Sequence, residues 1–320
     1  MNLSDFLRSE QFHKPFVAVL GHPVGHSLSP MIHNASLEEH QIEATYHAID
    51  CPEHQWVHVT KLLASPSCLG ANITLPLKQK IMDYLDKNEE SAREIGAVNT
   101  VVPEYGGEGV ITGNAETGDR HSSRQGSRRV LSGYNTDAFG FIKPLEQRRG
   151  ITCATVLGSG GASRAVNYAL SVHGIETIYL VSRRVGDSKT NDSADPGLNS
   201  RTLKKTHIKP VSYSDFLEAV KQSQLIVNTT PLGMYPQVAH TPFPEEALPF
   251  LDGKICYDII YNPLETKFMA DAKKHGAEII SGLDMFIYQA AKAFELWFSK
   301  PMPVERVRKL ILDHVTQSKS

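Results

Sequence analysis

Small polar side chains are concentrated in the first part of the chain, directly after short apolar runs that are typical of strands. Ligands of open α/β sheets bind beyond the carboxyl ends of the strands, so these side chains stand where a ligand would bind. Hydroxyl and amide groups with few charges suit a neutral polyol better than a phosphate. The residues concerned are Ser27, Ser29, Asn72, Thr74, Asn99, Asn135 and Asp137.

A glycine-rich turn follows an apolar run in the second part of the chain, within the sequence ATVLGSGGASR at residues 154–164. A strand, this turn and a helix form the context that a dinucleotide-binding fingerprint requires. Gly158 permits the tight turn, and Gly160 lets the backbone approach a pyrophosphate at the start of the helix. Ser163 replaces the third glycine of the fingerprint with another small residue. The pattern predicts a bound dinucleotide, and a plain glycine turn is the structural alternative.

The next predicted strand, TIYLV, ends in Ser182, Arg183 and Arg184, with no acidic residue at its tip. In NAD sites an acid at this place binds the ribose hydroxyls, and such an acid would repel the 2′-phosphate of NADP. Two guanidinium groups would attract that phosphate, so the sequence favours NADP over NAD. Asp187 stands nearby and leaves NAD open. Arginines that merely face solvent are the structural alternative.

Alternating strands and helices must position these residues. In the first part of the chain, strands are expected at 15–20, at 44–50, within CLGANIT and within GAVNTVV. Helices are expected at about 29–40, at 55–64 and over PLKQKIMDYLDK from Pro76, which puts Lys78 in the first turn of its helix. This alternation is typical of a largely parallel sheet with crossover helices.

The alternation restarts after Thr152 and continues towards the C-terminus. Strands are expected within ATVLG, TIYLVSR, LIVNTT and KICYDII, and a helix over SGGASRAVNYALSVHG. The segment LDMFIYQAAKAFELWF is apolar almost all round, which predicts a buried helix. The fold class is therefore α/β with two domains, a substrate domain with a mostly parallel sheet and a Rossmann-type domain. We place their boundary near 137–141 and expect the site in a cleft between them.

Two polar segments interrupt this pattern. Residues 104–130 are rich in glycine, serine and charge, which predicts a long mobile hairpin or a disordered loop. Residues 186–200 have the same composition. A partner-binding arm is the functional alternative for the first segment, and composition alone gives it little support.

Composition and charge exclude several classes of protein. A net charge of −2 without a basic domain argues against sequence-independent binding of nucleic acid. No apolar run approaches the roughly 20 residues of a membrane span, and the N-terminal residues lack the apolar core of a secretory signal. The four cysteines are far apart, so we expect reduced thiols in a cytoplasmic protein. His22 and His26 lie in a Gly/Pro-rich loop without a third ligand, so no metal is expected.

A series of motifs occurs in the order typical of the shikimate dehydrogenase family, which the chain resembles over nearly its whole length. Several of these motifs are specific to that family, although the glycine turn alone is not. The resemblance fails only in the segments at about 104–130 and 186–200. The motifs are GHPVGHSLSPMIHN, GANITLPLK, GAVNT, GYNTDAFGF, LGSGGASRA, NTTPLGM, YDIIYNP and GLDMFIYQAAKAFELW.

The resemblance implies a reversible, NADP-linked reduction of 3-dehydroshikimate to shikimate, in the biosynthesis of aromatic amino acids. By this likeness Lys78 and Asp137 are the catalytic pair. Lys78 would donate a proton to the developing alkoxide, and Asp137 would orient the ammonium group and bind a substrate hydroxyl. The predicted division is a substrate-binding domain of residues 1–137 plus 283–320 and an NADP-binding domain of residues 138–282.

The resemblance also implies binding residues. Those for the substrate carboxylate and hydroxyls are Ser27, Ser29, Thr74, Asn99, Tyr261 and Gln289. Those for the cofactor are Gly158, Ser159, Gly160, Gly161, Ala162, Ser182, Arg183, Arg184, Ile259 and Gly282. Gln289 has independent support, because an amide inside an apolar helix needs a partner.

Structural alternatives remain for these residues. They are a bond to nearby backbone for Gln289, a place at the rim for Tyr261, and helix capping for Ser27 and Ser29. We interpret Asn72 and Asn135 as residues that fix loops.

Two rival functions stay open at this stage. A quinate or dual quinate/shikimate dehydrogenase is commonly NAD-linked, and the strand end at Ser182 differs from the Asn-Arg-Thr that is frequent in NADP-linked members of the family. Ser29 favours shikimate, because a larger residue there would alter the room near the carboxylate. The other rival is a silent relative that senses the polyol, and the intact Lys78 and Asp137 argue against it. We expect a monomer or homodimer whose partner is its small-molecule substrate.

Overall fold

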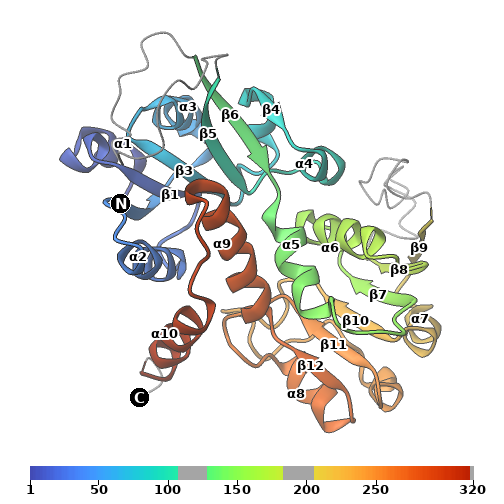
Figure 1. The fold of residues 1–320 in the computed structure, drawn as a ribbon. Helices are drawn as coiled ribbons and strands as arrows, with labels where there is room; N and C mark the ends of the chain where they lie inside the picture. Colours follow the sequence, from blue (N-terminus) through green and yellow to red (C-terminus); the bar gives the residue numbers. More distant parts are fainter. Residues whose placement is uncertain (107–127, 183–204, 318–320) are drawn as a thin grey trace. The chain divides into compact units, whose positions relative to one another are not determined.

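The computed structural model describes residues 1–106, 128–182 and 205–317 of the chain, which form two compact units (Figure 1). The N-terminal unit comprises residues 1–89 and 98–134, and the C-terminal unit comprises residues 90–97 and 135–320. Each unit contains one six-stranded sheet. Within the described ranges, no helix is long and apolar enough to cross a membrane.

The sheet of the N-terminal unit has the strand order β2-β1-β3-β5-β6-β4. Its strands are β1 (Phe16–Gly21), β2 (Thr45–Asp50), β3 (Cys68–Ile73), β4 (Lys87–Asn88), β5 (Thr100–Gly106) and β6 (Arg128–Tyr134). The pairs β1–β2, β1–β3 and β4–β6 are parallel, whereas β3–β5 and β5–β6 are antiparallel. The sheet is thus parallel around the fully buried β1, as its continuous apolar run predicts.

The helices of the N-terminal unit are α1 (Leu3–Arg8), α2 (Ser29–Glu39) and α3 (Trp56–Ala64), with 3₁₀ turns η1 (Glu10–His13), η2 (Glu53–Gln55) and η3 (Lys80–Tyr84). Pro30 stands in the first turn of α2, where its missing N–H costs no hydrogen bond. From α2, the Asn34 side chain bonds both the N–H and the carbonyl of Tyr46, at 2.8 and 3.1 Å. This pair of hydrogen bonds ties α2 to β2 and fixes the backbone of Tyr46.

The helix predicted from Pro76 is wrong. Residues 76–79 form turns, and only the short 3₁₀ helix η3 follows them. The Lys78 carbonyl accepts the N–H of Val98 at 2.8 Å, and the N–H of Met82 bonds Gln79 instead. A tertiary backbone bond therefore takes the acceptor that an α-helix would have used, and Lys78 does not lie in the first turn of a helix.

Strands β5 and β6 pair as antiparallel strands at the two ends of the predicted 104–130 segment, which overlaps β5 only from residue 104 and β6 only up to residue 130. Their register runs from Thr100 opposite Tyr134 to Gly106 opposite Arg128. Antiparallel pairing is thus present at both ends of that segment, as the hairpin alternative predicts. Residues 107–127, and the second polar segment at 186–200, lie outside the described residues.

The sheet of the C-terminal unit is parallel throughout, with the strand order β12-β11-β10-β7-β8-β9. Its strands are β7 (Cys153–Leu157), β8 (Thr177–Val181), β9 (His207–Val211), β10 (Leu225–Asn228), β11 (Ile255–Asp258) and β12 (Glu278–Ile280). This order reverses direction between β7 and β10, which is the switch point of a Rossmann fold. The predicted Rossmann-type domain is confirmed.

Alternate residues of the central strands bury both faces of this sheet. Val156 and Val227 join one core with residues of α5 (Thr136–Ile142) and α6 (Gly161–Val172). Leu157 and Ile226 join a second core with residues of α7 (Phe216–Gln222), η5 (Glu245–Phe250) and α8 (Lys267–Lys274). Helices on both faces explain why the strands read as continuous apolar runs.

The remaining helices of the C-terminal unit are α4 (Glu90–Ile95), η4 (Lys143–Leu145), α9 (Gly282–Phe298) and α10 (Val304–Gln317). Most residues of α9 are buried or half-buried, which confirms the predicted buried helix. Both α9 and α10 belong to the C-terminal compact unit. The assignment of residues 283–320 to substrate binding concerns their role and stays a prediction.

Candidate active site

A chain of buried hydrogen bonds links two predicted substrate residues of the N-terminal unit, Ser29 and Asn99, through side chains of β2, β3 and β5. The Tyr46 hydroxyl donates to Asn72 Oδ1 at 2.7 Å and also bonds the Ser29 side chain. Asn72 Nδ2 donates to the Asn99 carbonyl and to Thr100 Oγ1, each at 3.2 Å. The Thr100 hydroxyl in turn donates to Asn99 Oδ1 at 3.0 Å. Because all five residues are buried, the network fixes Ser29 and Asn99 relative to one another.

This network is electrically neutral. Burial raises the pKa of the Tyr46 hydroxyl above its ordinary value. The His33 ring stacks on Tyr46 with centroids 4.4 Å apart, and burial lowers the pKa of His33 to about 3. Both rings are therefore uncharged at neutral pH. Neutral hydroxyls and amides suit the polyol that the sequence predicts.

Lys78 and Thr74 lie on the segment that follows β3. The Thr74 N–H donates to the Leu20 carbonyl at 2.9 Å, which ties this segment to the end of β1. A Cβ at Gly21 would lie 2.3 Å from Thr74 Cγ2, so only glycine fits there. The backbone bond from Val98 to Lys78 places the main chain of Lys78 beside the residue preceding Asn99. Lys78, Thr74 and Asn99 are thus gathered at one end of the sheet.

The loop after β1 carries Ser27 and leads into α2 at Ser29. Ser29 is the first residue of α2, and Leu28 occupies the capping position without a side-chain bond. The Ser29 N–H donates to Ser27 Oγ at 3.3 Å, so Ser27 rather than Ser29 satisfies a backbone group at the start of the helix. Ser27 thus supports the start of α2, and the Ser29 side chain belongs to the Tyr46 network. Substrate binding by both serines stays a prediction.

Asp137 lies in the first turn of α5, in the C-terminal unit. Asn135 caps this helix, because its Oδ1 accepts the backbone N–H groups of Asp137 and Ala138 at 3.1 and 3.4 Å. Asn135 Nδ2 donates to the Ala97 carbonyl at 2.9 Å. The interpretation of Asn135 as a loop-fixing residue is confirmed, as it is for Asn72. The start of a helix also favours the negative charge of Asp137.

Tyr261 packs against α9, and Gln289 is a residue of that helix. The Tyr261 ring stacks on Phe286 with centroids 4.4 Å apart, and burial raises the pKa of its hydroxyl. Gln289 Nε2 donates to the Phe286 carbonyl at 2.9 Å, which is the local backbone bond expected as the structural alternative. A Cβ at Gly140 would lie 2.7 Å from the backbone nitrogen of Gln289, so α5 and α9 pack closely at this point. Substrate binding by Tyr261 and Gln289 stays a prediction.

The glycine turn has the geometry of a phosphate cradle. Gly158 has φ +107°, a conformation that favours glycine, and a Cβ there would lie 2.7 Å from Thr229 Oγ1. A Cβ at Gly160 or Gly161 would meet nothing within 4 Å, so the backbone is open above the turn. Gly161 begins α6, where unpaired N–H groups favour an anion. The turn therefore fits a dinucleotide pyrophosphate.

The end of β8 is connected to this turn. Ser182 Oγ and Ser159 Oγ are hydrogen-bonded at 2.9 Å. The two serines thus join the phosphate turn to the strand that would read the adenosine end. Arg183, Arg184 and Asp187, on which the choice between NADP and NAD depends, lie outside the described residues.

Ile259 and Gly282 are in direct contact. A Cβ at Gly282 would lie 2.4 Å from the carbonyl carbon of Ile259, so the start of α9 packs against backbone that follows β11. The Ile259 N–H donates to the Asn228 carbonyl at 3.2 Å, which continues the strand pairing into this loop. The structure thus brings together two residues predicted to lie beside the nicotinamide.

No group of three or more metal-ligating side chains occurs among the residues that the structure places. His22 Nδ1 bonds Asp50 Oδ2 at 2.8 Å. All four cysteines are unpaired. Burial raises the pKa of Cys51, Cys68 and Cys256 to about 12, 11 and 12, and it also raises the pKa of the half-buried Cys153.

Sequence reasoning missed Tyr46, which connects the residues of the predicted substrate site. It occurs in a predicted strand, where an aromatic residue reads as core. The available signal is that a buried tyrosine hydroxyl needs a hydrogen-bond partner. Its partners come from β3 and α2, which no local pattern identifies.

The strand order and glycine turn of the C-terminal unit define a Rossmann-type α/β protein, with a second unit built on a mixed sheet. The model of the shikimate dehydrogenase substrate-binding domain matches residues 19–101, and that of the shikimate 5′-dehydrogenase C-terminal domain matches residues 282–312. Shikimate dehydrogenase (NADP(+)) of Bacillus cereus strain AH187 is 36% identical over 93% of this chain and 98% of that relative. The chain belongs to the shikimate dehydrogenase family.

Solved structures show the same fold. Shikimate 5-dehydrogenase from Listeria monocytogenes, in complex with shikimate and NAD, has a TM-score of 0.78 at 26% identity, covering 93% of this chain and 96% of that one. The Thermus thermophilus enzyme, in complex with NADP(H) and shikimate, has a TM-score of 0.72 at 32% identity, covering 92% and 98%. The predicted fold class and family are confirmed.

Proposed function

We propose that this chain catalyses the reversible, NADPH-dependent reduction of 3-dehydroshikimate to shikimate. The observation that carries the proposal is the buried network of Ser29, Tyr46, Asn72 and Asn99, which presents neutral hydroxyl and amide groups in the unit that matches the substrate-binding family model. The Bacillus cereus relative, named as an NADP(+) enzyme, supports the same substrate and cofactor.

Lys78 is the proposed acid and base, and Asp137 its orienting partner. Bound NADPH supplies the hydride that reduces the substrate carbonyl. The Lys78 ammonium group donates a proton to the carbonyl oxygen as it becomes a hydroxyl, and Lys78 takes the proton back in the direction of oxidation. The Asp137 carboxylate orients the ammonium group and accepts a hydrogen bond from a substrate hydroxyl. The backbone anchors at Val98 and Asn135 support these roles, because each fixes the segment that carries the residue.

Six residues are proposed to bind the substrate. Together they would bind the substrate carboxylate and hydroxyls: Ser27, Ser29, Thr74, Asn99, Tyr261 and Gln289. The support is strongest for Ser29 and Asn99, whose positions are coupled through Asn72. Gln289 can serve through its Oε1, since Nε2 is used within its own helix.

The cofactor is proposed to be NADP. Gly158, Ser159, Gly160, Gly161 and Ala162 would hold the pyrophosphate, which fits the open backbone above Gly160 and Gly161. The strand end, Ser182, Arg183 and Arg184, would bind the 2′-phosphate, on the sequence argument that guanidinium groups attract it. Ile259 and Gly282 would lie beside the nicotinamide.

A cytoplasmic location and a monomeric or homodimeric state belong to the same proposal. The support for the location is that all four thiols are unpaired, as expected in a reducing compartment. Light scattering combined with size-exclusion chromatography would measure the mass in solution.

A steady-state matrix tests the proposed function. Shikimate and quinate are each measured against NADP and NAD, and we expect the highest kcat/KM for shikimate with NADP. Highest activity with quinate and NAD would replace the proposal with the quinate dehydrogenase. Absence of turnover in all four combinations, with shikimate binding retained in calorimetry, would indicate a sensor instead.

A further inference from the structure

Asp258, the last residue of β11, is a fully buried carboxylate surrounded by hydrogen-bond donors. Asn228 Nδ2 lies 3.2 Å from each of its oxygens, and the N–H of Ile260 donates to Oδ1 at 3.0 Å. The Thr266 hydroxyl donates to Oδ2 at 2.6 Å. Three residues from three segments thus converge on one carboxylate, which no step of the proposed reaction uses directly.

Asn228 links the Asp258 carboxylate to the loop that follows β10, because its side chain forms hydrogen bonds with both. Its Oδ1 accepts both the N–H and the hydroxyl of Thr230, at 2.9 and 2.8 Å. The neighbouring Thr229 bonds the Leu157 carbonyl at the end of β7 through its N–H and its hydroxyl, at 3.0 and 2.6 Å. Thr229 is also the residue against which Gly158 packs. The carboxylate is therefore linked, through Asn228, to the support of the glycine turn.

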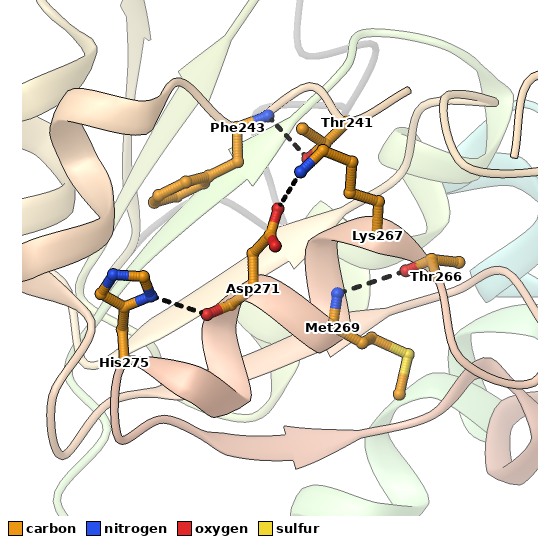
Figure 2. A network of polar contacts seen from close by, with 7 residues as sticks. All are labelled: Thr241, Phe243, Thr266, Lys267, Met269, Asp271 and His275. Atoms are coloured by element: carbon orange, nitrogen blue, oxygen red, sulfur yellow. Dashed lines mark hydrogen bonds and ion pairs between the residues drawn. The ribbon is translucent and has the colours of Figure 1, made fainter. Parts of the chain in front are cut away.

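Thr266 links the Asp258 carboxylate to α8. Figure 2 shows its side chain at the start of this helix, where Oγ1 accepts the N–H of Met269 at 3.3 Å. The next turn is closed by the ion pair between Lys267 and Asp271 at 2.5 Å, and the Asp271 carbonyl bonds the ring of His275 at 2.8 Å (Figure 2). The hydroxyl that caps α8 is thus the same one that donates to Asp258.

The segment held by these bonds is the loop of residues 259–261. The Asp258 carboxylate accepts the Ile260 N–H, and the Asn228 backbone carbonyl accepts the Ile259 N–H. Gly282 packs against the Ile259 carbonyl, and the Tyr261 ring stacks on Phe286. The loop is therefore held between the carboxylate on one side and the start of α9 on the other.

We propose that Asp258 is a positioning residue: its carboxylate fixes the loop of residues 259–261 and thereby places Ile259 and Tyr261 for the reaction. The inference rests on the proposed function, which assigns these two residues to the nicotinamide and the substrate. Asp258 touches neither reactant in this proposal. Loss of an acceptor oxygen on Asp258 would let the loop shift, and a misplacement of about 1 Å near reacting atoms can cost roughly a hundredfold in rate.

Asp258→Asn tests this role, because the replacement keeps the size and one acceptor oxygen but turns the other into a donor that faces Thr266 and Asn228. We expect kcat/KM for shikimate to fall by about tenfold to a hundredfold. Binding of adenosine 2′,5′-bisphosphate, the adenosine end of NADP, should stay within about twofold, because the glycine turn keeps its Thr229 support.

Thr155→Val is the matched control. Thr155 and Ser223 share a fully buried hydrogen bond of 2.8 Å in the same sheet, and neither residue lies in the loops after β10 or β11. We expect this variant to lose thermal stability while its kcat/KM stays near the wild-type value. An equal loss of kcat/KM in both variants would overturn the proposal, because the effect would then follow any buried polar defect.

A second pair of variants keeps the test informative if Asp258→Asn does not fold. Thr266→Val removes the donor to Asp258, and Thr266→Ser keeps it. We expect Thr266→Val to lower kcat/KM for shikimate and Thr266→Ser to restore it. Equal kinetics in the two Thr266 variants would contradict the proposal.

Failure of the inference differs from failure of the proposed function. Wild-type protein without shikimate turnover would refute the function. In that case, amide hydrogen exchange at Ile260 and Tyr261 still tests Asp258: faster exchange in Asp258→Asn than in Thr155→Val supports positioning, and equal exchange overturns it. Wild-type turnover with unchanged kinetics in Asp258→Asn would refute the inference alone.

Discussion

The two units solve the same problem, the fixing of loops beyond a sheet, with different chemistry. In the N-terminal unit, Tyr46 and Asn72 connect the loops through neutral groups. In the C-terminal unit, the loops after β10 and β11 meet at the carboxylate of Asp258. A neutral network holds its geometry over a wide pH range, whereas a buried carboxylate couples loop geometry to protonation. The difference predicts that pH acts on the loops after β10 and β11 of the C-terminal unit rather than on the Tyr46 network of the N-terminal unit.

The largest effect is expected at Lys78, which lies in the N-terminal unit but outside its neutral network. Lys78→Ala should lower kcat by about 10²–10⁴-fold, because it removes the proposed proton donor. NADPH binding, followed by fluorescence titration, should change little. Comparable losses of turnover and of NADPH binding would contradict the catalytic assignment.

Gly282→Ala should break the support of the loop in the C-terminal unit. A Cβ there would lie 2.4 Å from backbone atoms of Ile259, and forced overpacking of this kind costs about 3 kcal/mol. Urea denaturation measures the loss in the free energy of unfolding. Gly161→Ala is the matched control, since its Cβ meets nothing within 4 Å. It should keep stability and weaken NADPH binding instead, and equal destabilisation by both variants would argue against the close packing.

The pH dependence of stability separates the charged network from the neutral one. Burial is the main cause that raises the pKa of Asp258 from 3.8 to about 6. A raised pKa in the folded state means that this group's contribution to stability is fully present below pH 3.8 and is lost as the pH rises through about 6. The contribution can reach about 3 kcal/mol.

Denaturation of wild type and Asp258→Asn at several pH values measures this contribution. The free energy of unfolding of wild type, relative to the variant, should fall between pH 3.8 and about 6 and stay level above that range. Parallel pH profiles of the two proteins would show that Asp258 does not titrate in this window.

Tyr46→Phe tests the neutral network of the N-terminal unit. The change removes the hydroxyl that Asn72 and Ser29 share, and a buried partner left unsatisfied costs about 1–2 kcal/mol. We expect a higher KM for shikimate and the same pH profile of stability as wild type. Tyr168→Phe, on α6 of the other unit, is the control and should leave that KM unchanged. A new pH dependence in Tyr46→Phe would contradict the neutrality of the network.

Arg183→Ala has the smallest expected effect. Loss of one guanidinium group should weaken NADPH by about tenfold relative to NADH, because charge-assisted bonds to the 2′-phosphate contribute roughly this much. Steady-state KM values for both cofactors measure the ratio. An unchanged ratio would remove the sequence argument for NADP, and a similar loss for both cofactors would point to a structural role.

Most of the individual strands could be predicted from the sequence, because they depend on local apolar runs. The strands β4, β9 and β12 match no predicted strand, and the strand order does not follow from local patterns. The apolar runs gave the strands around β1 and β7, and the glycine turn gave the start of α6. The helix expected from Pro76 was wrong because its hydrogen bonds are decided by Val98, which lies far along the chain. Lys78 was identified by family likeness, but its local structure could not be.

The connecting residues could not be predicted for the same reason. Tyr46 and Asp258 act through partners that are 26 and 30 residues away in the sequence, so no periodicity shows the contact. The sequence does contain a hint for Asp258, an acidic residue inside the apolar run KICYDII. A charge in such a run needs donors, and the donors are visible only in the folded chain.

The cysteines described above make the protein convenient for site-directed labelling. Thiolate, rather than thiol, attacks maleimide reagents, and burial raises the pKa of all four native thiols. Val172, at the end of the helix that begins at the glycine turn, is 64% exposed. The thiol introduced by Val172→Cys should therefore react with a maleimide dye faster than the native thiols do. The emission of the attached dye would then report cofactor binding in the otherwise unaltered chain.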